Sequence, residues 1–429
     1  MKRFILRILQ WKLTFLAKRV LHRYAPIVVG VAGSVGKTSS VQAIALALGR
    51  DYRVGQTLRS YNQELGVPLS ILRQETGYRS LWRWIAILLR GCWLGYGVRD
   101  AQYPNLFVLE LGADSPGDVD KLMAWVKPQV GVLTAATIEH VEFFGSIEAA
   151  MAEERKVLTK LPKTAVAVVN ADDPSAMVAT GSCKARVVRY GLHDGADVTL
   201  TNASILGTDA NTVQGVSAKV VVGGSSVPIV VRDTLGRHSL YAVGAGFAVA
   251  HALGAKLTNA SEQLRMYQPP AGRMRVIRGV KDTTIIDDTY NSSPAAANAA
   301  LDTLHELSTP GLKYAVLGDM RELGPVSEDE HRKLGAYVVG KADVLVTVGE
   351  QAKWIANGAR EHGFADDRIL SFDKPDGVGN FLQDRIKHAD LILVKGSQGI
   401  RCEKVVKEFM AEPTRAAELL TRQYKPWIE

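Results

Sequence analysis

The chain has 429 residues, of which 47% are hydrophobic and 22% charged, and its formal net charge is +8. This length exceeds what one ordinary core serves, so two or three domains are expected. The composition is typical of a globular α/β protein and excludes disordered and fibrous chains. The scattered cysteines Cys92, Cys183 and Cys402 show neither metal-ligand spacing nor a disulfide framework, which indicates reduced thiols in a cytosolic protein.

The first 24 residues are basic and amphipathic, with seven Lys or Arg side chains and no acidic one. No apolar run reaches the roughly 18–20 residues that a membrane span needs. A small-residue cleavage site is also missing, which argues against a signal peptide. Such a helix either lies on an anionic membrane surface or packs its apolar face on the following domain, and the sequence favours neither placement.

A glycine-rich loop, GVAGSVGKTSS at 30–40, follows an apolar strand and leads into a helical stretch. Backbone amides in this arrangement point toward a bound phosphate, and the helix dipole favours its negative charge. Lys37 is expected to reach the β- and γ-phosphates, and the Thr38 hydroxyl to bind Mg²⁺. Val31 stands where the standard phosphate loop has glycine, which argues against a common GTPase or kinase. The residues expected to contact the nucleotide here are Gly33, Ser34, Val35, Gly36, Lys37, Thr38 and Ser39.

The segment RSLWRWIAILLRGCWLGYGVRD, 79–100, combines tryptophans with arginines and predicts an amphipathic interfacial hairpin. Its apolar run from Ile85 to Leu89 is too short to span a bilayer. Residues 1–24 and 79–100 together suggest peripheral contact with a membrane. No arginine-rich groove or repeated aromatic platform favours nucleic acid as a partner.

Apolar runs alternate with helical stretches over residues 26–178, which predicts a parallel, doubly wound sheet. Short β-rich pieces between 185 and 232 predict a small antiparallel flap on the same domain, and a helix over 239–256 returns to its core. The strands expected before the flap are 26–32, 106–111, 129–134 and 164–169.

A domain boundary is predicted where Pro269, Pro270 and Gly272 interrupt the helical pattern. Beyond it, strands alternate with helices in a second α/β domain of Rossmann type. The strands expected there are 283–288, 313–318, 343–348, 369–372 and 391–395. The expected organisation is an amphipathic helix over 1–25, a central nucleotide-binding domain over 26–268 and a Rossmann-like domain over 269–429.

Six segments in one order resemble the Mur ligases, which join amino acids to a muramoyl peptide in cell-wall precursor synthesis. The resemblance covers roughly residues 26–410 and is nearest to the MurF type, which adds D-Ala-D-Ala. The segments are YNQELGVPLSIL (61–72), VLELGADSPGDVDKL (108–122), ATIEHVEFFGS (136–146), GRMRVIRGVKDTTIIDDTYNSSP (272–294), LGDMRELGPVSEDEH (317–331) and LVKGSQGIRCEKVV (393–406).

The resemblance implies an ATP- and Mg²⁺-dependent ligase that phosphorylates a carboxylate and lets an amine attack the acyl phosphate. In that family a glutamate and a histidine contact the metal, and these roles fall on Glu110 and His140. The hinge arginine falls on Arg273, which with Lys37 would stabilise the transferring phosphoryl group. Taken without the resemblance, Glu110 is also compatible with a structural charge, His140 with an ordinary loop histidine and Arg273 with a solvated linker residue.

The C-terminal domain contributes further candidates. Asp288, at the end of a strand, suits hydrogen bonding to the ribose hydroxyls, and the alternative for the pair Asp287-Asp288 is a solvated turn. Asn291 is placed at the nucleotide by the resemblance alone. Lys395 and Ser397 either hold the carboxylate of the incoming dipeptide or shape a turn between strand and helix.

The chain departs from the Mur pattern in three places. A separate domain that binds the uridine nucleotide normally precedes the phosphate loop, and here only the first helix does, so a lipid could anchor the acceptor instead. A carbamylated lysine that holds the second magnesium falls on Glu154, whose own carboxylate could replace it; a solvated helix face is the alternative. Both asparagines of an H-N-x-x-N element are replaced, by Ser239 and Ala242, which weakens the case for adenine selectivity.

These observations predict a cytoplasmic, monomeric MurF-like ligase with ATP and Mg²⁺ as cofactors and a muramoyl-type peptide and D-Ala-D-Ala as substrates, peripheral on the inner face of the membrane. One alternative is the same chemistry on a lipid-linked, non-uridylyl or folate-like acceptor. The other is a catalytically degenerate, membrane-associated binding protein.

Overall fold

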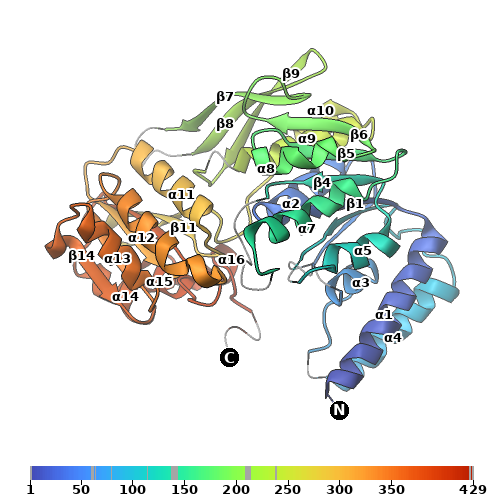
Figure 1. The fold of residues 1–429 in the computed structure, drawn as a ribbon, viewed down its shortest axis with the longest axis horizontal. Helices are drawn as coiled ribbons and strands as arrows, with labels where there is room; N and C mark the ends of the chain where they lie inside the picture. The colour runs from blue at the N-terminus through green and yellow to red at the C-terminus, as the bar shows by residue number, and fades with distance from the viewer. Residues whose placement is uncertain are drawn as a thin grey trace.

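Two β-sheets, each covered by helices, make up the protein (Figure 1). The computed structural model describes residues 2–58, 62, 64–78, 80–113, 115–136, 144–207, 214–236, 239–424 and 427. The first sheet belongs to the N-terminal and central part of the chain, and the second to the C-terminal part. Both sheets are dominated by parallel strands, so the predicted α/β class is confirmed.

The first sheet has nine strands in the order β2-β3-β1-β4-β5-β6-β7-β8-β9. Its strands up to β7 pair in parallel, and β7, β8 and β9 continue it as an antiparallel extension. The strands are β1 (Ile27–Ala32), β2 (Val54–Gln56), β3 (Leu106–Glu110), β4 (Val130–Leu133), β5 (Val166–Asn170), β6 (Arg186–Gly191), β7 (Val198–Leu206), β8 (Gly215–Val222) and β9 (Ser225–Arg232).

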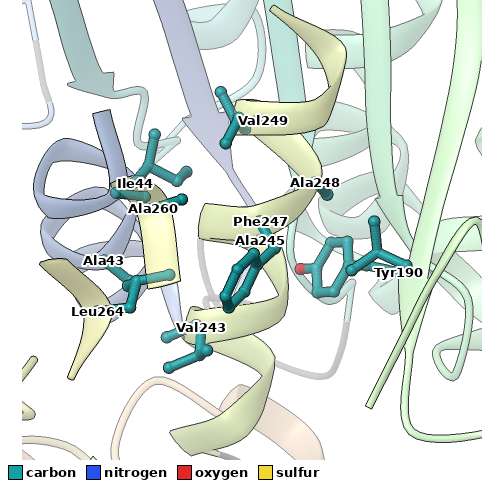
Figure 2. Packing of buried hydrophobic residues seen from close by; sticks show 14 of the residues in the cluster. Ala43, Ile44, Tyr190, Val243, Ala245, Phe247, Ala248, Val249, Ala260 and Leu264 are labelled. Carbon is teal, nitrogen blue, oxygen red and sulfur yellow. The ribbon is translucent and has the colours of Figure 1, made fainter. Parts of the chain in front are cut away.

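Two hydrophobic clusters, one on each face, hold helices against this sheet. The first cluster includes α2 (Lys37–Leu48), α9 (Ser239–Ala252) and α10 (Leu257–Leu264), and Figure 2 shows Phe247 and its neighbours packed between them. Helices α2 and α9 approach closely because α9 has a glycine at the contact: a Cβ on Gly246 would lie 3.2 Å from the carbonyl oxygen of Ala43.

The second cluster lies on the opposite face and also receives the first helix of the chain. It buries side chains of α1, α3, α4, α5 and α7 together with those of the strands. These helices are α1 (Lys2–Tyr24), α3 (Gly66–Ile71), α4 (Leu81–Tyr96), α5 (Asp118–Val126) and α7 (Ile147–Thr159), and α8 (Pro174–Met177) with η1 (Val178–Gly181) follows them.

The second sheet has six strands in the order β10-β11-β15-β12-β13-β14, with only β10 antiparallel to its neighbour. Its strands are β10 (Arg275–Arg278), β11 (Thr284–Asp288), β12 (Lys313–Gly318), β13 (Val344–Val348), β14 (Ile369–Phe372) and β15 (Leu391–Lys395). The covering helices are α11 (Pro294–Glu306), α12 (Ser327–Val338), α13 (Ala352–Glu361), α14 (Val378–Gln383), α15 (Glu403–Phe409) and α16 (Ala416–Leu419), with 3₁₀ turns η2 (Val280–Asp282), η3 (Gly324–Val326), η4 (Asp366–Arg368) and η5 (Pro413–Arg415).

Nearly all predicted strands are present within two residues of their expected ends. The short edge strands β2 and β10 were not predicted, and β6 belongs to the parallel part of the sheet although it was placed in the flap. The predicted boundary at residue 269 falls between α10 and β10.

The prediction of a hairpin over 79–100 is wrong, because the described residues there form the single helix α4. This helix packs against α1. Of the two placements left open for the first helix, packing is confirmed: Leu13, Leu16 and Val20 are buried in the second cluster. Within the described part of the chain, no helix combines the length and apolarity needed to cross a bilayer.

The packed face of α1 gives a stability prediction. Leu16 is 5% exposed whereas the neighbouring Phe15 is 49% exposed. Leu16→Ala should lower the free energy of unfolding by about 2–5 kcal/mol, because it leaves a cavity in the second cluster. Phe15→Ala, the matched control, should change it by less than about 0.5 kcal/mol. Urea denaturation measures both, and a change for Leu16→Ala as small as that for Phe15→Ala would show that α1 does not pack on the domain in solution.

Candidate active site

The glycine-rich loop joins β1 to α2 and closes tightly on the end of β4. Gly33 has φ +132°, and a Cβ there would lie 2.2 Å from the Thr134 hydroxyl oxygen, so only glycine fits. The amide of Ser34 donates to the carbonyl of Ala135 (2.7 Å), and the Thr134 hydroxyl donates to the carbonyl of Val35 (2.7 Å). The loop is therefore held by its neighbours in the shape that presents amides to a phosphate.

The start of α2 provides the charge that a phosphate needs. Gly36 precedes the helix in a left-handed conformation and has no side chain to cap it. The backbone amides of the first turn can therefore donate hydrogen bonds to phosphate oxygens. The Lys37 ammonium bends back over the loop and donates to the carbonyls of Gly33 and Ser34. The ammonium therefore lies beside the loop itself, and its contact with the β- and γ-phosphates stays a prediction.

Thr38 and Glu110, both predicted to hold metal, are adjacent in the structure. The Thr38 hydroxyl donates to one carboxylate oxygen of Glu110 (3.0 Å), and the Asn62 amide donates to the other (3.0 Å). Glu110 ends β3, directly beside Val31 of β1, and is 2% exposed. Hydroxyl and carboxylate oxygens are donors that Mg²⁺ prefers, so this pair fits the ion. Among the described residues, no cluster of three or more His, Cys, Asp or Glu forms a complete cage.

Glu154 lies behind the phosphate loop. It is 4% exposed on α7, and its carboxylate accepts a hydrogen bond from the amide of Gly33 (2.7 Å). The alternative of a solvated helix face is therefore wrong. His140, predicted to contact metal, lies outside the described residues.

A cleft of about 710 Å³ runs from the phosphate loop to the second sheet. The phosphate loop, the carboxyl ends of β3, β4 and β5 and the start of α9 line it on one side, and the segments after β11 and β15 line it on the other. Of the predicted residues, it is lined by Ser34, Val35, Gly36, Lys37, Thr38, Ser39, Glu110, Arg273, Asp288, Asn291 and Lys395.

Asp288 and Lys395 form a buried ion pair on the C-terminal side of this cleft. The ammonium donates to Asp288 Oδ2 (2.7 Å) and to the carbonyl of Asn291 (2.8 Å), while the amide of Met274 donates to Asp288 Oδ1 (3.1 Å). Asp288 is thus not a solvated turn residue. Lys395 thus shapes the C-terminal wall of the cleft, and this favours a structural role over direct binding of a substrate carboxylate.

Arg273 enters the cleft from the segment between the two sheets. Its guanidinium lies 4.3 Å from the ring centre of Tyr290. Its Nε is buried and has no hydrogen-bond partner among the residues that the structure describes. An unsatisfied buried cationic donor beside a phosphate loop suits an anionic ligand.

Arg422, which sequence reasoning missed, secures the loop after β11. Its buried guanidinium pairs with Glu403 (2.9 Å) and donates to the carbonyls of Thr289 (2.5 Å) and Tyr290 (3.0 Å). Burial alone would raise the pKa of Glu403, but the hydrogen bonds from Arg422 and Arg401 outweigh it and keep that pKa below its ordinary value. No motif marked Arg422, since the two carbonyls that it holds lie 132 and 133 residues away in the sequence.

Tyr241 occupies the region of the missing asparagines. Its hydroxyl donates to Asp172 (3.0 Å), which follows β5, and both residues line the cleft with Ser239 and Ala242. The rule that ligands bind at the carboxyl ends of parallel strands could have marked Asp172.

Ser397 lies in a second, adjoining cavity of about 340 Å³. Its hydroxyl accepts from the amide of Arg321 (2.8 Å) and donates to the carbonyl of Ser292 (3.3 Å). The buried hydroxyl of Ser293 borders both cavities and has no hydrogen-bond partner within the described part of the chain. The two cavities therefore offer adjoining places for a nucleotide and a smaller polar molecule.

The geometry describes an enzyme with a phosphate loop on one α/β unit and a Rossmann-like unit facing it across a nucleotide-sized cleft. Residues 97–250 match the Mur ligase middle domain, and residues 272–398 match the Mur ligase, glutamate ligase domain. The chain belongs to the Mur ligase family.

Relatives and solved structures agree with this assignment. The UDP-N-acetylmuramoyl-tripeptide–D-alanyl-D-alanine ligase of Bacillus subtilis is 28% identical, over 93% of this chain and 79% of its own length. MurF ligase from Thermotoga maritima in complex with ADP is 26% identical with a TM-score of 0.75, covering 93% of this chain and 83% of that one. Folylpolyglutamate synthase from Mycobacterium tuberculosis, complexed with ADP and AMPPCP, shares the fold at 17% identity and TM-score 0.61, over 90% of this chain and 93% of that one.

Asp287 gives a pH prediction for this site. It is fully buried, its Oδ2 has no hydrogen-bond partner in the described ranges, and burial raises its pKa from 3.8 to about 7. The folded protein thus keeps a proton that the unfolded chain releases near pH 4, and the free energy of unfolding falls as pH rises from about 4 to about 7. Asp287→Asn removes the titrating carboxyl group. The free energy of unfolding of this variant, relative to that of the parent, should therefore rise between about pH 4 and about pH 7 and stay constant above that range. Urea denaturation at several pH values measures the difference, with exposed Asp384→Asn as control; a pH-independent difference would contradict the assignment.

Proposed function

We propose that this protein is an ATP-dependent amide ligase that joins D-Ala-D-Ala to the carboxylate of a muramoyl-type peptide in cell-wall precursor synthesis. The observation that carries this proposal is the single cleft in which Lys37, Thr38 and Glu110 face Arg273 of the second unit. MurF-type relatives, of whose own length the match covers 79% and 77%, support the substrates.

A carboxylate does not react with an amine at neutral pH, because it is a poor electrophile. The γ-phosphoryl group of ATP is therefore transferred to a carboxylate oxygen, and ADP leaves. The amine of the incoming dipeptide then attacks the acyl carbon, inorganic phosphate leaves and the amine loses a proton. The protein's part is alignment and charge neutralisation by Lys37 and Arg273.

Thr38 and Glu110 would hold Mg²⁺, which supplies charge neutralisation at the phosphate oxygens. Asp288, Asn291 and the Tyr241 region are proposed to line the nucleoside end. We assign the second cavity, with Ser397, to the incoming dipeptide.

We propose that the enzyme works as a monomer on the cytoplasmic side, at the membrane surface. One chain supplies both walls of the cleft, so a second copy is not needed to complete it. Whether the acceptor carries a uridine nucleotide or a lipid anchor is the open choice, and assays with both acceptors decide it.

The reaction is tested with purified protein, ATP, Mg²⁺, D-Ala-D-Ala and either UDP-muramoyl-tripeptide or its lipid-linked form. Phosphate release should require both dipeptide and acceptor. Lys37→Ala should lower kcat at least about hundredfold, because one preorganised cationic donor is lost. Lys163→Ala, at an exposed lysine outside the cleft, is the control. Nucleotide binding without release on either muramoyl acceptor or on a folate would leave the degenerate binding protein as the answer.

A substitution of Glu154 can distinguish two roles of its carboxylate. If it only supports the loop through the amide of Gly33, Glu154→Gln retains an acceptor oxygen and should keep most activity. If it also holds metal, Glu154→Gln should raise the Mg²⁺ concentration needed for half-maximal rate by about tenfold or more. Magnesium titrations of the parent and of Glu154→Gln separate the two, and unchanged curves would rule out the metal role.

A further inference from the structure

Helices α1 and α4 lie side by side and run in the same direction, extending from the body of the first unit (Figure 1). A Cβ on Gly91 would lie 2.9 Å from Leu16 Cδ1, which shows how closely the helices pack. Further along, Arg23 donates to the carbonyl of Gly97 (2.7 Å). The inner faces of both helices enter the same core cluster.

The opposite face of α1 is apolar as well. Ile8, Trp11 and Phe15 are 41%, 67% and 49% exposed. At about 100° per residue they lie on one stripe, about 130° around the helix from the buried Leu16 and Val20. A helix that only packed on its domain would carry polar side chains there.

Helix α4 repeats this pattern. Trp82, Leu89 and Tyr96, spaced seven residues apart, are 78%, 64% and 58% exposed, while Ile87 and Leu94 are buried on the other side. The two exposed stripes therefore both point away from the core cluster. Scattered exposed hydrophobic residues need no explanation, but two aligned stripes on paired helices do.

Basic side chains border these stripes. On α1, Arg7 and Lys18 lie on one side of the exposed stripe, and Lys12 and Arg19 on the other, all of them exposed. The Arg19 guanidinium lies 5.0 Å from the ring centre of Tyr96, so a cation links the two stripes. The sequences of the two helices contain no Asp or Glu.

We propose that this outer face of α1 and α4 binds the surface of an anionic phospholipid bilayer. Tryptophan and tyrosine favour the boundary between headgroups and acyl chains, and the flanking Lys and Arg side chains pair with lipid phosphates. The charge decides against a second copy of the chain as occupant, because two such faces would bring like charges together. The helices lie on the membrane rather than crossing it, consistent with their short apolar runs.

The test uses the full chain with vesicles of phosphatidylglycerol and phosphatidylcholine in equal parts, compared with vesicles of phosphatidylcholine alone. The protein should float with the anionic vesicles only, and less in high salt. Tryptophan fluorescence should shift to the blue on binding, as Trp11 and Trp82 leave water.

Two double variants examine the two parts of the face. Trp11→Ala/Trp82→Ala and Lys12→Glu/Lys18→Glu should each weaken binding to the anionic vesicles at least about tenfold. The matched controls, Val178→Ala/Met266→Ala and Lys163→Glu/Lys374→Glu, change exposed side chains elsewhere and should bind like the parent. All variants should retain the parent's thermal unfolding and nucleotide binding, since none touches the cleft.

A folded parent that does not bind anionic vesicles would overturn the proposal. So would a parent that sediments as a dimer and becomes a monomer in Trp11→Ala/Trp82→Ala, since a second copy would then cover the face. Direct vesicle binding does not depend on the ligase reaction, so its failure is distinguishable from failure of the proposed activity.

Discussion

The close approach of Gly33 to the end of β4 is the constraint on which the site depends. With no Cβ at this position, the loop can pack against Thr134 and Ala135 and direct its amides toward one point. Glu154 holds the same turn from behind through the Gly33 amide. Four elements, β1, α2, β4 and α7, are therefore placed relative to one another by a turn of a few residues.

In the second unit, an ion pair between two neighbouring strand ends shapes the wall of the cleft. Asp288 and Lys395 end the parallel neighbours β11 and β15, where their charges neutralise each other at the cleft. Arg422 then holds the carbonyls that follow β11. The cleft thus joins the carboxyl ends of two parallel sheets, the position at which such sheets bind ligands. Transfer of a phosphoryl group between substrates held on either side is the chemistry that this arrangement suits.

Much of this was predictable because it is local in sequence. The phosphate loop, the strand that ends in Glu110 and the alternating pattern of the second unit each occupy a short continuous segment. Three contacts were not predicted, because no sequence spacing indicates them. The residues that they join lie 133 positions apart for Arg422 and Thr289, 76 for Arg321 and Ser397, and 69 for Tyr241 and Asp172. The pairing of α4 with α1 was missed for the same reason: the tryptophan pattern describes one helix face, not its neighbour.

The buried Nε of Arg273 affects how tightly the enzyme holds its ligands. Among the described residues this nitrogen has no hydrogen-bond partner, and burying an unpaired donor costs free energy before any substrate arrives. An anion that satisfies this nitrogen removes the cost, so binding is more favourable than its new contacts alone would give. The same relief opposes departure of the last anion, because its release leaves the buried nitrogen unpaired again.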